Sequence, residues 1–325
     1  MYFVLTKIIV YQLYIYIRVL LMKKLSILGI FVADLAFFGK IPKVGETILG
    51  ENFVVGPGGK GSNQSVAAGK AGASIDFITK VGDDDYGKMA FRIYKETNVG
   101  SNFVYVSEEH NTGVAAILLN KDTGENAISV VPGAAGALTI DDINNAKEVI
   151  TNSSIFLTQL EAPMDVVVHA LKIAKENNVT TILNPAPAAK LDPSVFPLID
   201  YFTPNESEAS FYASGDISNK DDAEKYGQEF LNLGVKNLLV TLGDQGVYFQ
   251  NNKEKYFEPA LDLGSKVIDT SGAGDAFSGA FATAICEEKS ISDSIKFANV
   301  FAGISTTRIG TANSMPTREE IEKLL

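Results

Sequence analysis

One segment near the carboxyl end of the chain reads Val267-Ile268-Asp269-Thr270-Ser271-Gly272-Ala273-Gly274-Asp275-Ala276-Phe277-Ser278-Gly279-Ala280. Its apolar start ends in Asp269, its glycines permit a tight turn, and small apolar residues continue to Ile285. The continuation predicts a buried helix. The amides of Gly272, Ala273 and Gly274 would then point outward together at the positive end of that helix, which is a favourable place for an anion.

Asp275 falls in the first turn of this predicted helix, beside any anion bound there. A carboxylate next to an anion is electrostatically unfavourable unless it has a chemical task. The task we expect is to take the proton from a hydroxyl that attacks a phosphate. The alternative is an ordinary glycine turn in which Asp275 caps the helix. This segment alone leaves both interpretations open.

The composition limits the classes of protein to consider. A length of 325 residues favours two domains, or one large α/β domain with an appendage. The formal net charge of −11 argues against a nucleic-acid partner. The single cysteine, Cys286, excludes an internal disulfide and predicts a reducing compartment, so we expect a cytoplasmic protein. With only His110 and His169 besides, a zinc site is not expected.

Residues 1–21 differ in composition from the rest of the chain. The run from Tyr2 to Leu21 is apolar and about long enough to span a bilayer, but Arg18 lies within it. A small-residue cleavage site does not follow, which argues against a secretory signal. We therefore expect an upstream extension outside the fold, which starts at Met22, and no membrane partner. A membrane anchor is the alternative.

From Leu25 onward, short apolar strands alternate with helical stretches. This alternation predicts an α/β fold with a doubly wound, mostly parallel sheet and helices on both faces, within one domain over residues 22–325. Between about 101 and 132 strands follow one another without helices. Together with residues 34–55 they are expected to form a small antiparallel sheet. We interpret it as a lid that excludes water, as a dimerisation surface, or as both.

A second glycine-rich segment, Gly56-Pro57-Gly58-Gly59-Lys60-Gly61-Ser62-Asn63-Gln64, lies between a predicted strand and a predicted helix. It formally fits the dinucleotide pattern G-x-G-x-x-G, although Pro57 removes an amide that could face a pyrophosphate. A P-loop is excluded because Gly61 follows Lys60. What remains is a backbone that a ligand can approach closely, with Lys60 and Asn63 as donors to a polyhydroxylated compound or a phosphate.

Three further positions carry polar groups where strands are expected to end. Asp34 and Glu161 each follow a predicted strand, the place where open α/β sheets bind ligands. Asn205 opens a predicted helix, and Glu208 three residues later completes a capping pair. A functional interpretation instead places Asn205 and Glu208 near magnesium and phosphate.

The two glycine segments, in this order, resemble the signatures of the ribokinase-like carbohydrate kinase family. The N-terminal signature is matched by Gly58 to Gln64 and the C-terminal one by Asp269 to Phe277, and the resemblance covers nearly all of residues 22–325. It implies a phosphotransferase that uses ATP, Mg²⁺ and a monovalent cation such as K⁺ to phosphorylate a primary hydroxyl of a sugar. D-ribose is the first candidate sugar.

The resemblance also implies roles for individual residues. Asp275 matches the catalytic base, and Gly272, Ala273 and Gly274 match its anion hole. The sugar-binding positions are Asp34, Gly59, Lys60, Gly61, Ser62, Asn63 and Glu161, with Asp275 beside them. The nucleotide positions are Asn205, Thr241, Leu242, Gly243, Asp244, Gln245, Gly246, Gly274 and Asn299. Glu208 joins Asn205 in an element linked to magnesium and phosphate. The positions matching a monovalent-cation site, mostly through backbone carbonyls, are Asp269, Ser271, Ser305, Arg308, Gly310 and Ser314.

Val32 departs from the family pattern, because ribose-phosphorylating members usually carry Asn there. Loss of that amide costs ~1–3 kcal/mol if a sugar hydroxyl stays unpaired. An apolar residue instead suits a sugar that lacks the hydroxyl. The alternatives are thus a kinase for another pentose, a deoxysugar or a nucleoside, a non-catalytic sugar- or nucleotide-binding protein, and a dinucleotide-dependent oxidoreductase. We expect a homodimer joined through the lid.

Overall fold

The computed structural model describes residues 24–120, 123, 125–262 and 267–325. The expectation for residues 1–21 lies outside these ranges. Within them, no helix combines the length and the apolar character needed to cross a membrane.

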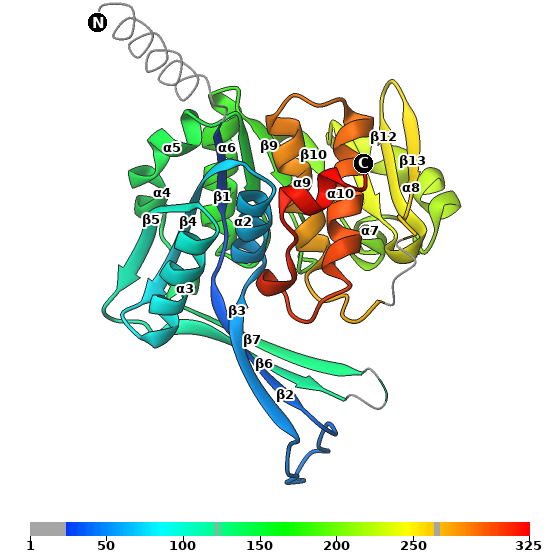
Figure 1. The fold of residues 1–325 in the computed structure, drawn as a ribbon. Helices are drawn as coiled ribbons and strands as arrows, with labels where there is room; N and C mark the ends of the chain where they lie inside the picture. Colours follow the sequence, from blue (N-terminus) through cyan, green and yellow to red (C-terminus); the bar gives the residue numbers. More distant parts are fainter. Residues whose placement is uncertain (1–23, 121–122, 124, 263–266) are drawn as a thin grey trace, which may run out of the picture.

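Nine strands of the described chain form one large sheet in the order β13-β12-β11-β10-β9-β8-β1-β4-β5 (Figure 1). Pairing is parallel from β5 to β11 and antiparallel at β12 and β13, which confirms the predicted mostly parallel sheet. The strands are β1 Lys24–Leu28, β4 Ser74–Gly82, β5 Val99–Ser107, β8 Ile155–Thr158, β9 Thr180–Leu183, β10 Tyr201–Phe202, β11 Asn237–Thr241, β12 Gly246–Asn251 and β13 Lys255–Pro259.

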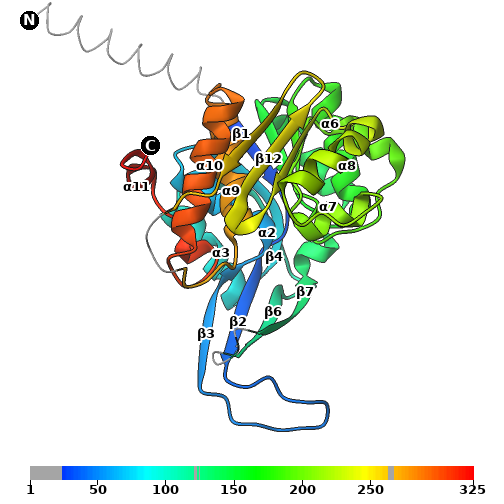
Figure 2. The ribbon, with the colours of Figure 1, turned by 90° about the vertical axis from the view of Figure 1, so that its right-hand side faces the viewer.

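Helices cover both faces of this sheet, and each face has its own apolar core. Figure 2 shows α9 and α10 on one side of β1 and β12, and α6, α7 and α8 on the other. The first core takes residues from α2 Lys60–Lys70, α3 Asp85–Glu96, α9 Ala273–Cys286, α10 Ile291–Ser305 and α11 Arg318–Glu322. The second takes residues from α4 Ile140–Asn145, α5 Lys147–Thr151, α6 Met164–Glu176, α7 Glu206–Tyr212 and α8 Lys220–Leu233. Short 3₁₀ turns are η1 Ala134–Ala137, η2 Pro193–Leu198, η3 Gly243–Gln245 and η4 Ala312–Ser314.

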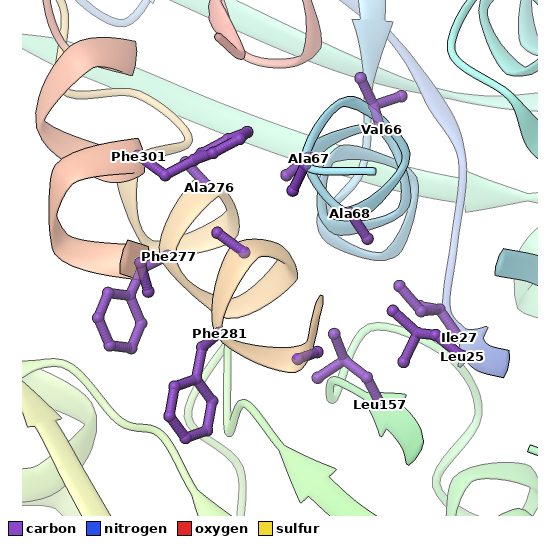
Figure 3. Packing of buried hydrophobic residues seen from close by; sticks show 14 of the residues in the cluster. Leu25, Ile27, Val66, Ala67, Ala68, Leu157, Ala276, Phe277, Phe281 and Phe301 are labelled. Carbon is purple, nitrogen blue, oxygen red and sulfur yellow. The ribbon is translucent and has the colours of Figure 1, made fainter. Parts of the chain in front are cut away.

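The predicted helix after the glycine turn is α9, and it packs directly on α2 (Figure 3). Small residues allow the close approach: a Cβ added at Gly279 would lie 2.3 Å from the carbonyl oxygen of Gln64 and 2.8 Å from the Cβ of Ala67. On its other side α9 buries two stacked rings, Phe277 and Phe281, with centroids 5.9 Å apart. The contact therefore brings the start of α9 beside the start of α2.

Four further strands of the described residues form the smaller sheet, which projects from the body in both views (Figures 1 and 2). They are β3 Asn52–Gly58, β2 Val32–Phe38, β6 Thr112–Leu119 and β7 Asn126–Gly133, in that order. We call this sheet the lid. Its outer pairs are antiparallel as expected, whereas the central pair β2 and β6 is parallel.

The strand expected at Phe103–Val106 is part of β5 and pairs with β4 in the large sheet, so residues 101–107 are not part of the lid. The reason is that α3 links β4 to β5 as a parallel crossover, and Val99 and Val104 are buried in the first core. The lid begins again only at Thr112.

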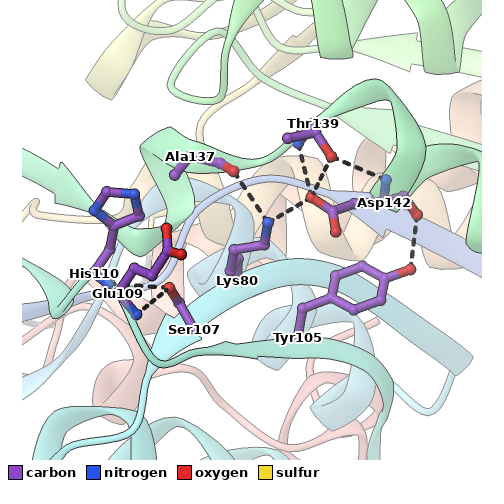
Figure 4. A network of polar contacts seen from close by, with 8 residues as sticks. All are labelled: Lys80, Tyr105, Ser107, Glu109, His110, Ala137, Thr139 and Asp142. Atoms are coloured by element: carbon purple, nitrogen blue, oxygen red, sulfur yellow. Dashed lines mark hydrogen bonds and ion pairs between the residues drawn. The ribbon is translucent and has the colours of Figure 1, made fainter.

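A polar network fixes the segment that follows the lid to the large sheet (Figure 4). Lys80 of β4 donates to the carbonyl of Ala137 at 3.0 Å and to the carboxylate of Asp142 at 2.6 Å. Tyr105 of β5 donates to the backbone carbonyl of Asp142 at 2.7 Å. Thr139 caps α4 through a capping box with Asp142. The chain leaving β7 is thereby held in a fixed position on the body.

Candidate active site

Where the structure describes the chain, three hollows meet at the turn that opens α9. The lid hollow, about 630 Å³, lies between the lid and the body and includes Asp34, Asn63 and Asp275. The central hollow, about 140 Å³, lies over the start of α9. The outer hollow, about 470 Å³, lies beside α10. Thr270 lines all three, and Asp275 lines both the lid hollow and the central hollow.

The turn itself is built on Gly272, whose φ of 75° is left-handed and suits glycine. Gly272, Ala273 and Gly274 all line the central hollow, as predicted for an anion site. One amide differs from the prediction: Ala273 N–H donates to the carbonyl of Thr270 at 3.1 Å, because the left-handed residue closes a tight turn. The three amides therefore do not all point outward.

Asp275 lies in the first turn of α9 and is buried. Its Oδ2 accepts a hydrogen bond from Asn63 Nδ2 at 3.0 Å, and its Oδ1 accepts one from Gln64 Nε2 at 3.0 Å. Asn63, which we predicted to bind a sugar, thus contacts Asp275 as well as lining the lid hollow. Gln64 lies in the N-terminal signature, but its contact with Asp275 was not predicted.

Asp34 lies within β2 and not beyond a strand end, because the apolar run from Leu25 to Phe31 is interrupted and a second strand starts at Val32. Its carboxylate packs over Gly58, where an added Cβ would lie 2.1 Å from Asp34 Oδ1. Burial raises the pKa of Asp34 to about 6; the hydroxyl of Thr311, which donates at 3.3 Å, opposes this rise and the charge of Asp275 adds to it.

Glu161 faces the same lid hollow and accepts a hydrogen bond from the backbone amide of Lys60 at 2.8 Å. Burial raises the pKa of Glu161 to about 7, although the charge and the amide of Lys60 oppose the rise. Two carboxyl groups in one hollow therefore titrate near neutral pH. Perturbed carboxyl groups of this kind are typical of functional sites.

Lys60 is the cation among these carboxylates, and it lines both the lid hollow and the central hollow. Burial acts to lower the pKa of Lys60, but the charges of Asp275, Glu161 and Glu208 outweigh it and raise the pKa above its usual value. Lys60 therefore stays charged where the two hollows join.

Asn205 and Glu208 form a capping box at the start of α7, as expected for a pair of residues that caps a helix. Glu208 N–H donates to Asn205 Oδ1 at 2.8 Å, and Asn205 N–H donates to Glu208 Oε2 at 3.0 Å. Both residues also line the central hollow. Burial raises the pKa of Glu208.

Among the described residues, no group of three or more His, Cys, Asp or Glu side chains could by itself hold a metal ion. Mg²⁺ in phosphate-transferring sites is usually held by one or two carboxylates together with substrate phosphates and water. A single carboxylate at the edge of an anion site, as Glu208 is, fits this requirement.

The nucleotide positions separate into two groups. Gly243, Asp244 and Asn299 line the outer hollow, and Thr241 lines the central hollow. Leu242, Gln245 and Gly246 instead build the turn between β11 and β12: Leu242 is buried, Gln245 Nε2 donates to the carbonyl of Ser218 at 2.9 Å, and Gly246 adopts a φ of 123°.

Hydrogen bonds to the carboxylate of Asp269 join three of the proposed monovalent-cation residues, Asp269, Ser271 and Gly310. Asp269 Oδ1 accepts from Ser271 N–H and its Oδ2 from Gly310 N–H, both at 2.9 Å. The hydroxyls of Ser305 and Ser314 donate to carbonyls one turn earlier, and the guanidinium of Arg308 pairs with Glu320. A cation site at the backbone carbonyls of these residues, as the resemblance implies, is a proposal.

Two site residues besides Gln64 were not assigned from the sequence. Thr270 joins the three hollows. Thr311 donates to Asp34 and, at 3.1 Å, to the carbonyl of Pro57, and so links the C-terminal segment to the lid. Thr270 follows Asp269 and Thr311 follows Gly310, which were both assigned, so their position in the sequence was the signal that could have identified them.

Comparisons with known proteins identify the family of the chain. Residues 22–318 match the model of the pfkB family carbohydrate kinases. A ribokinase of Haemophilus influenzae is 35% identical over 306 residues, which cover 93% of this chain and 98% of the relative. A deoxyribokinase of Salmonella typhi is 32% identical over 303 residues, with the same shares. The structure of Arabidopsis thaliana ribokinase complexed with ribose and ATP superposes with a TM-score of 0.86 at 29% identity, covering 94% of this chain and 99% of that one.

The chain therefore belongs to the pfkB family of carbohydrate kinases. The predicted resemblance, the fold class and the assignment to phosphotransferases acting on a sugar hydroxyl are confirmed. Membership of this family replaces the oxidoreductase interpretation of the segment from Gly56 to Gln64.

Proposed function

We propose that this carbohydrate kinase transfers the γ-phosphoryl group of ATP to the primary hydroxyl of D-ribose. One observation carries the proposal: Asp275 lies at the start of α9, on the border between the lid hollow and the central hollow. A base in this place can reach a hydroxyl on one side and a phosphate on the other. The ribokinases among the relatives support ribose as the acceptor and ATP as the donor.

In the proposed reaction the sugar lies in the lid hollow, where Asp34, Asn63 and Glu161 accept from or donate to its hydroxyls. Asp275 takes the proton of the primary hydroxyl. The hydroxyl oxygen bonds to the γ-phosphorus, and the bond to the oxygen bridging the β- and γ-phosphorus breaks, leaving ADP. The Gly272 and Gly274 amides and the positive end of α9 stabilise the charge on the transferring group.

The nucleotide is proposed to lie across the central and outer hollows, with its phosphates near Lys60 and Asn205 and its base near Asn299. Glu208 and Asn205 are the residues that would hold Mg²⁺, which neutralises part of the phosphate charge when bound. A K⁺ ion is proposed at the carbonyls around Asp269, where it would hold the Gly272 turn in place.

A second candidate acceptor is 2-deoxyribose, and Val32 is the observation that favours it. Val32 is only 2% exposed and contributes an apolar surface to the lid hollow. A pocket wall without a hydrogen-bonding group suits a sugar with one hydroxyl fewer. The deoxyribokinase among the relatives is consistent with this candidate.

We also propose that two copies associate through their lids, and that the protein acts in the cytoplasm. The lid face turned away from the lid hollow exposes Phe37, Phe53, Val55 and Val131, each at least 36% exposed. An apolar face of this kind is typical of an interface between protein chains. The single cysteine supports a reducing compartment.

A coupled ATP-consumption assay on the full chain, with Mg²⁺ and K⁺, tests the substrate. Ribose, 2-deoxyribose, fructose, a hexose phosphate and a nucleoside should be compared by kcat/KM. Preference for ribose supports the first proposal, and preference for 2-deoxyribose supports the second. In the latter case Val32→Asn should restore turnover of ribose. Absence of turnover with every acceptor would contradict both, and would favour a binding protein on this fold.

A further inference from the structure

Gln64 is a buried side chain whose amide contacts Asp275, and the family comparison gives it no role. It lies on α2, is 0% exposed, and donates from Nε2 to Asp275 Oδ1 at 3.0 Å and to Asn184 Oδ1 at 3.1 Å. The –NH₂ group has two hydrogens, and these two acceptors use both.

The orientation of the Gln64 amide is fixed from its other end. Gln159 Nε2, just after β8, donates to Gln64 Oε1 at 2.6 Å. Asn184, just after β9, is held in turn because its Nδ2 donates to the carbonyl of Thr203 at 2.8 Å. A reversed Gln64 amide would place an oxygen against the carboxylate and a donor against Gln159 Nε2, so the network permits one orientation.

The backbone makes room for this network. A Cβ at Gly29 would lie 2.3 Å from Gln159 Oε1, and one at Gly61 would lie 2.9 Å from the same atom. A Cβ at Gly29 would also lie 2.7 Å from the α-carbon of Gly61. Gln159 therefore occupies a slot that larger residues at either glycine would fill.

We propose that Gln64 is a positioning residue for the phosphoryl transfer: held by Gln159 and Asn184, it fixes the carboxylate plane of Asp275. This inference rests on the proposed role of Asp275 as base. Hydrogen bonds donated to a carboxylate favour its charged state, and two donors on different oxygens also prevent the group from rotating. Asn63 supplies the second donor from the lid side.

The charged groups around Asp275 show why such donors matter. Lys60 on α2 interacts with Asp275 as an opposite charge. Asp34 on β2, Glu161 after β8 and Glu208 on α7 each interact with it as a like charge. One cation faces several carboxyl groups. The hydrogen bonds that Gln64 and Asn63 donate to Asp275 come from uncharged amides, so they do not change when the neighbouring carboxyl groups gain or lose a proton.

The test is Gln64→Leu in the full-length protein, with Ser65→Ala as the matched control. Ser65 is the next buried residue of α2, and its hydroxyl donates to the carbonyl of Gly61 within its own helix.

We expect Gln64→Leu to lower kcat by ~10–100-fold, which is less than the effect of losing the base itself. The KM values for sugar and ATP should change less than ~3-fold. Ser65→Ala should match the wild type.

Gln159→Leu provides a second, milder variant, which leaves Gln64 in place but removes its anchor. Its kcat should fall by ~3–10-fold in the same pattern. A kcat within ~2-fold of wild type in both variants, or a loss that appears in the KM values and not in kcat, would overturn the inference. Asp275→Asn distinguishes failure of the positioning role from failure of the proposed function. If Asp275→Asn is inactive while Gln64→Leu and Gln159→Leu are fully active, only the positioning role of Gln64 is wrong. If Asp275→Asn is active, the proposed role of Asp275 as base is wrong as well.

Discussion

Asp275 combines two features that a simple helix-capping residue would not need. It is 6% exposed, and both of its oxygens accept hydrogen bonds from side chains of another helix. Burial of a charge is costly unless partners compensate it. The protein supplies these partners at the border of two hollows, which is consistent with a base that acts between a sugar and a phosphate.

The first prediction concerns this residue. Asp275→Asn keeps the shape of the side chain but removes the proton acceptor, so kcat should fall by ~100–10,000-fold, the range expected for a lost general base. Sugar and nucleotide affinity, measured by calorimetry, should change little. Asp85→Asn is the control, since Asp85 is 96% exposed on α3. Near-normal turnover of Asp275→Asn would contradict the mechanism.

A second prediction follows from the raised pKa values of Glu161, about 7, and Asp34, about 6. As pH falls through this range both carboxyl groups become neutral and accept hydrogen bonds from sugar hydroxyls less well. Sugar affinity should therefore weaken from pH 8 to pH 5.5. In Glu161→Gln, which cannot ionise, calorimetric titration should show weaker sugar binding at pH 8 and a smaller dependence on pH.

Glu161 should also affect the pH dependence of the unfolding free energy. Because its pKa is raised, this effect has the opposite sign to that of a surface carboxylate whose pKa is lowered by an ion pair. Its folded pKa is higher than in an unfolded chain, so its contribution to stability is fully present below the unfolded pKa and is lost as pH rises through about 7. At pH 8 Glu161→Gln should therefore raise the unfolding free energy of the ligand-free protein, by ~1–3 kcal/mol. A loss of stability at pH 8 that equals the loss at pH 5 would contradict this sign.

At the scale of elements, the pair α2 and α9 carries the site, because each glycine segment opens one of these helices. Their separation is set by Gly279, where an added Cβ would lie 2.3 Å from a backbone oxygen of α2. Gly279→Ala should lower the unfolding free energy by ~1–3 kcal/mol, as expected for overpacking, and should also lower kcat because Asp275 moves away from Asn63 and Gln64. Denaturant unfolding and steady-state kinetics measure the two effects.

A suitable control is Gly50→Ala, because a Cβ there would meet the carbonyl of Phe38 at an ordinary 3.5 Å. This variant should keep both stability and kcat. If Gly279→Ala lost stability but kept full kcat, the separation of α2 and α9 would not control the site.

The elements also show what the sequence can and cannot predict. The sequence predicted the alternation of strands and helices, the buried helix α9 and the two glycine turns, because hydrophobic periodicity and turn residues are local signals. The sequence did not predict the break between β1 and β2. Residues 25–33, where the chain passes from the large sheet to the lid, are all apolar or small, so no residue type marks the break. Part of β5 was wrongly assigned to the lid, because a strand pattern in the sequence does not show which other strand it pairs with.

The candidate site divides in the same way. Asp275 and Lys60 stand in motifs with a local signature, so their place was predictable. The bonds from Gln64 and Asn63 to Asp275, and from Thr311 to Asp34, join residues more than 200 positions apart. Such contacts depend on how helices pack, and a single sequence carries no direct signal for them.

At the scale of the whole molecule, the lid exposes apolar side chains on both of its faces. On the side of the lid hollow, Ile117, Ile128 and Val130 face the body. Cross-strand register places Phe37, Phe53 and Leu118 together on the opposite side, where the rings of Phe37 and Phe53 pack with centroids 4.7 Å apart. An exposed apolar sheet face of this kind is typical of an interface between chains, where the partner covers it.

The last prediction is that a second copy of this chain supplies that covering. A two-fold axis would bring the same apolar face of each lid together, since such interfaces are self-complementary. Sedimentation of the full chain should give a dimer, and Phe53→Lys should shift it toward the monomer, because two buried charges would oppose each other across the axis. Leu233→Lys, at the end of α8 and 37% exposed, is the control and should remain dimeric. If the lid is ordered by its partner, Phe53→Lys should also raise the KM for sugar while leaving the KM for ATP unchanged, since the outer hollow lies on the body. A Phe53→Lys protein that stays dimeric would place the interface elsewhere, and a monomer with unchanged sugar KM would show that each lid closes alone.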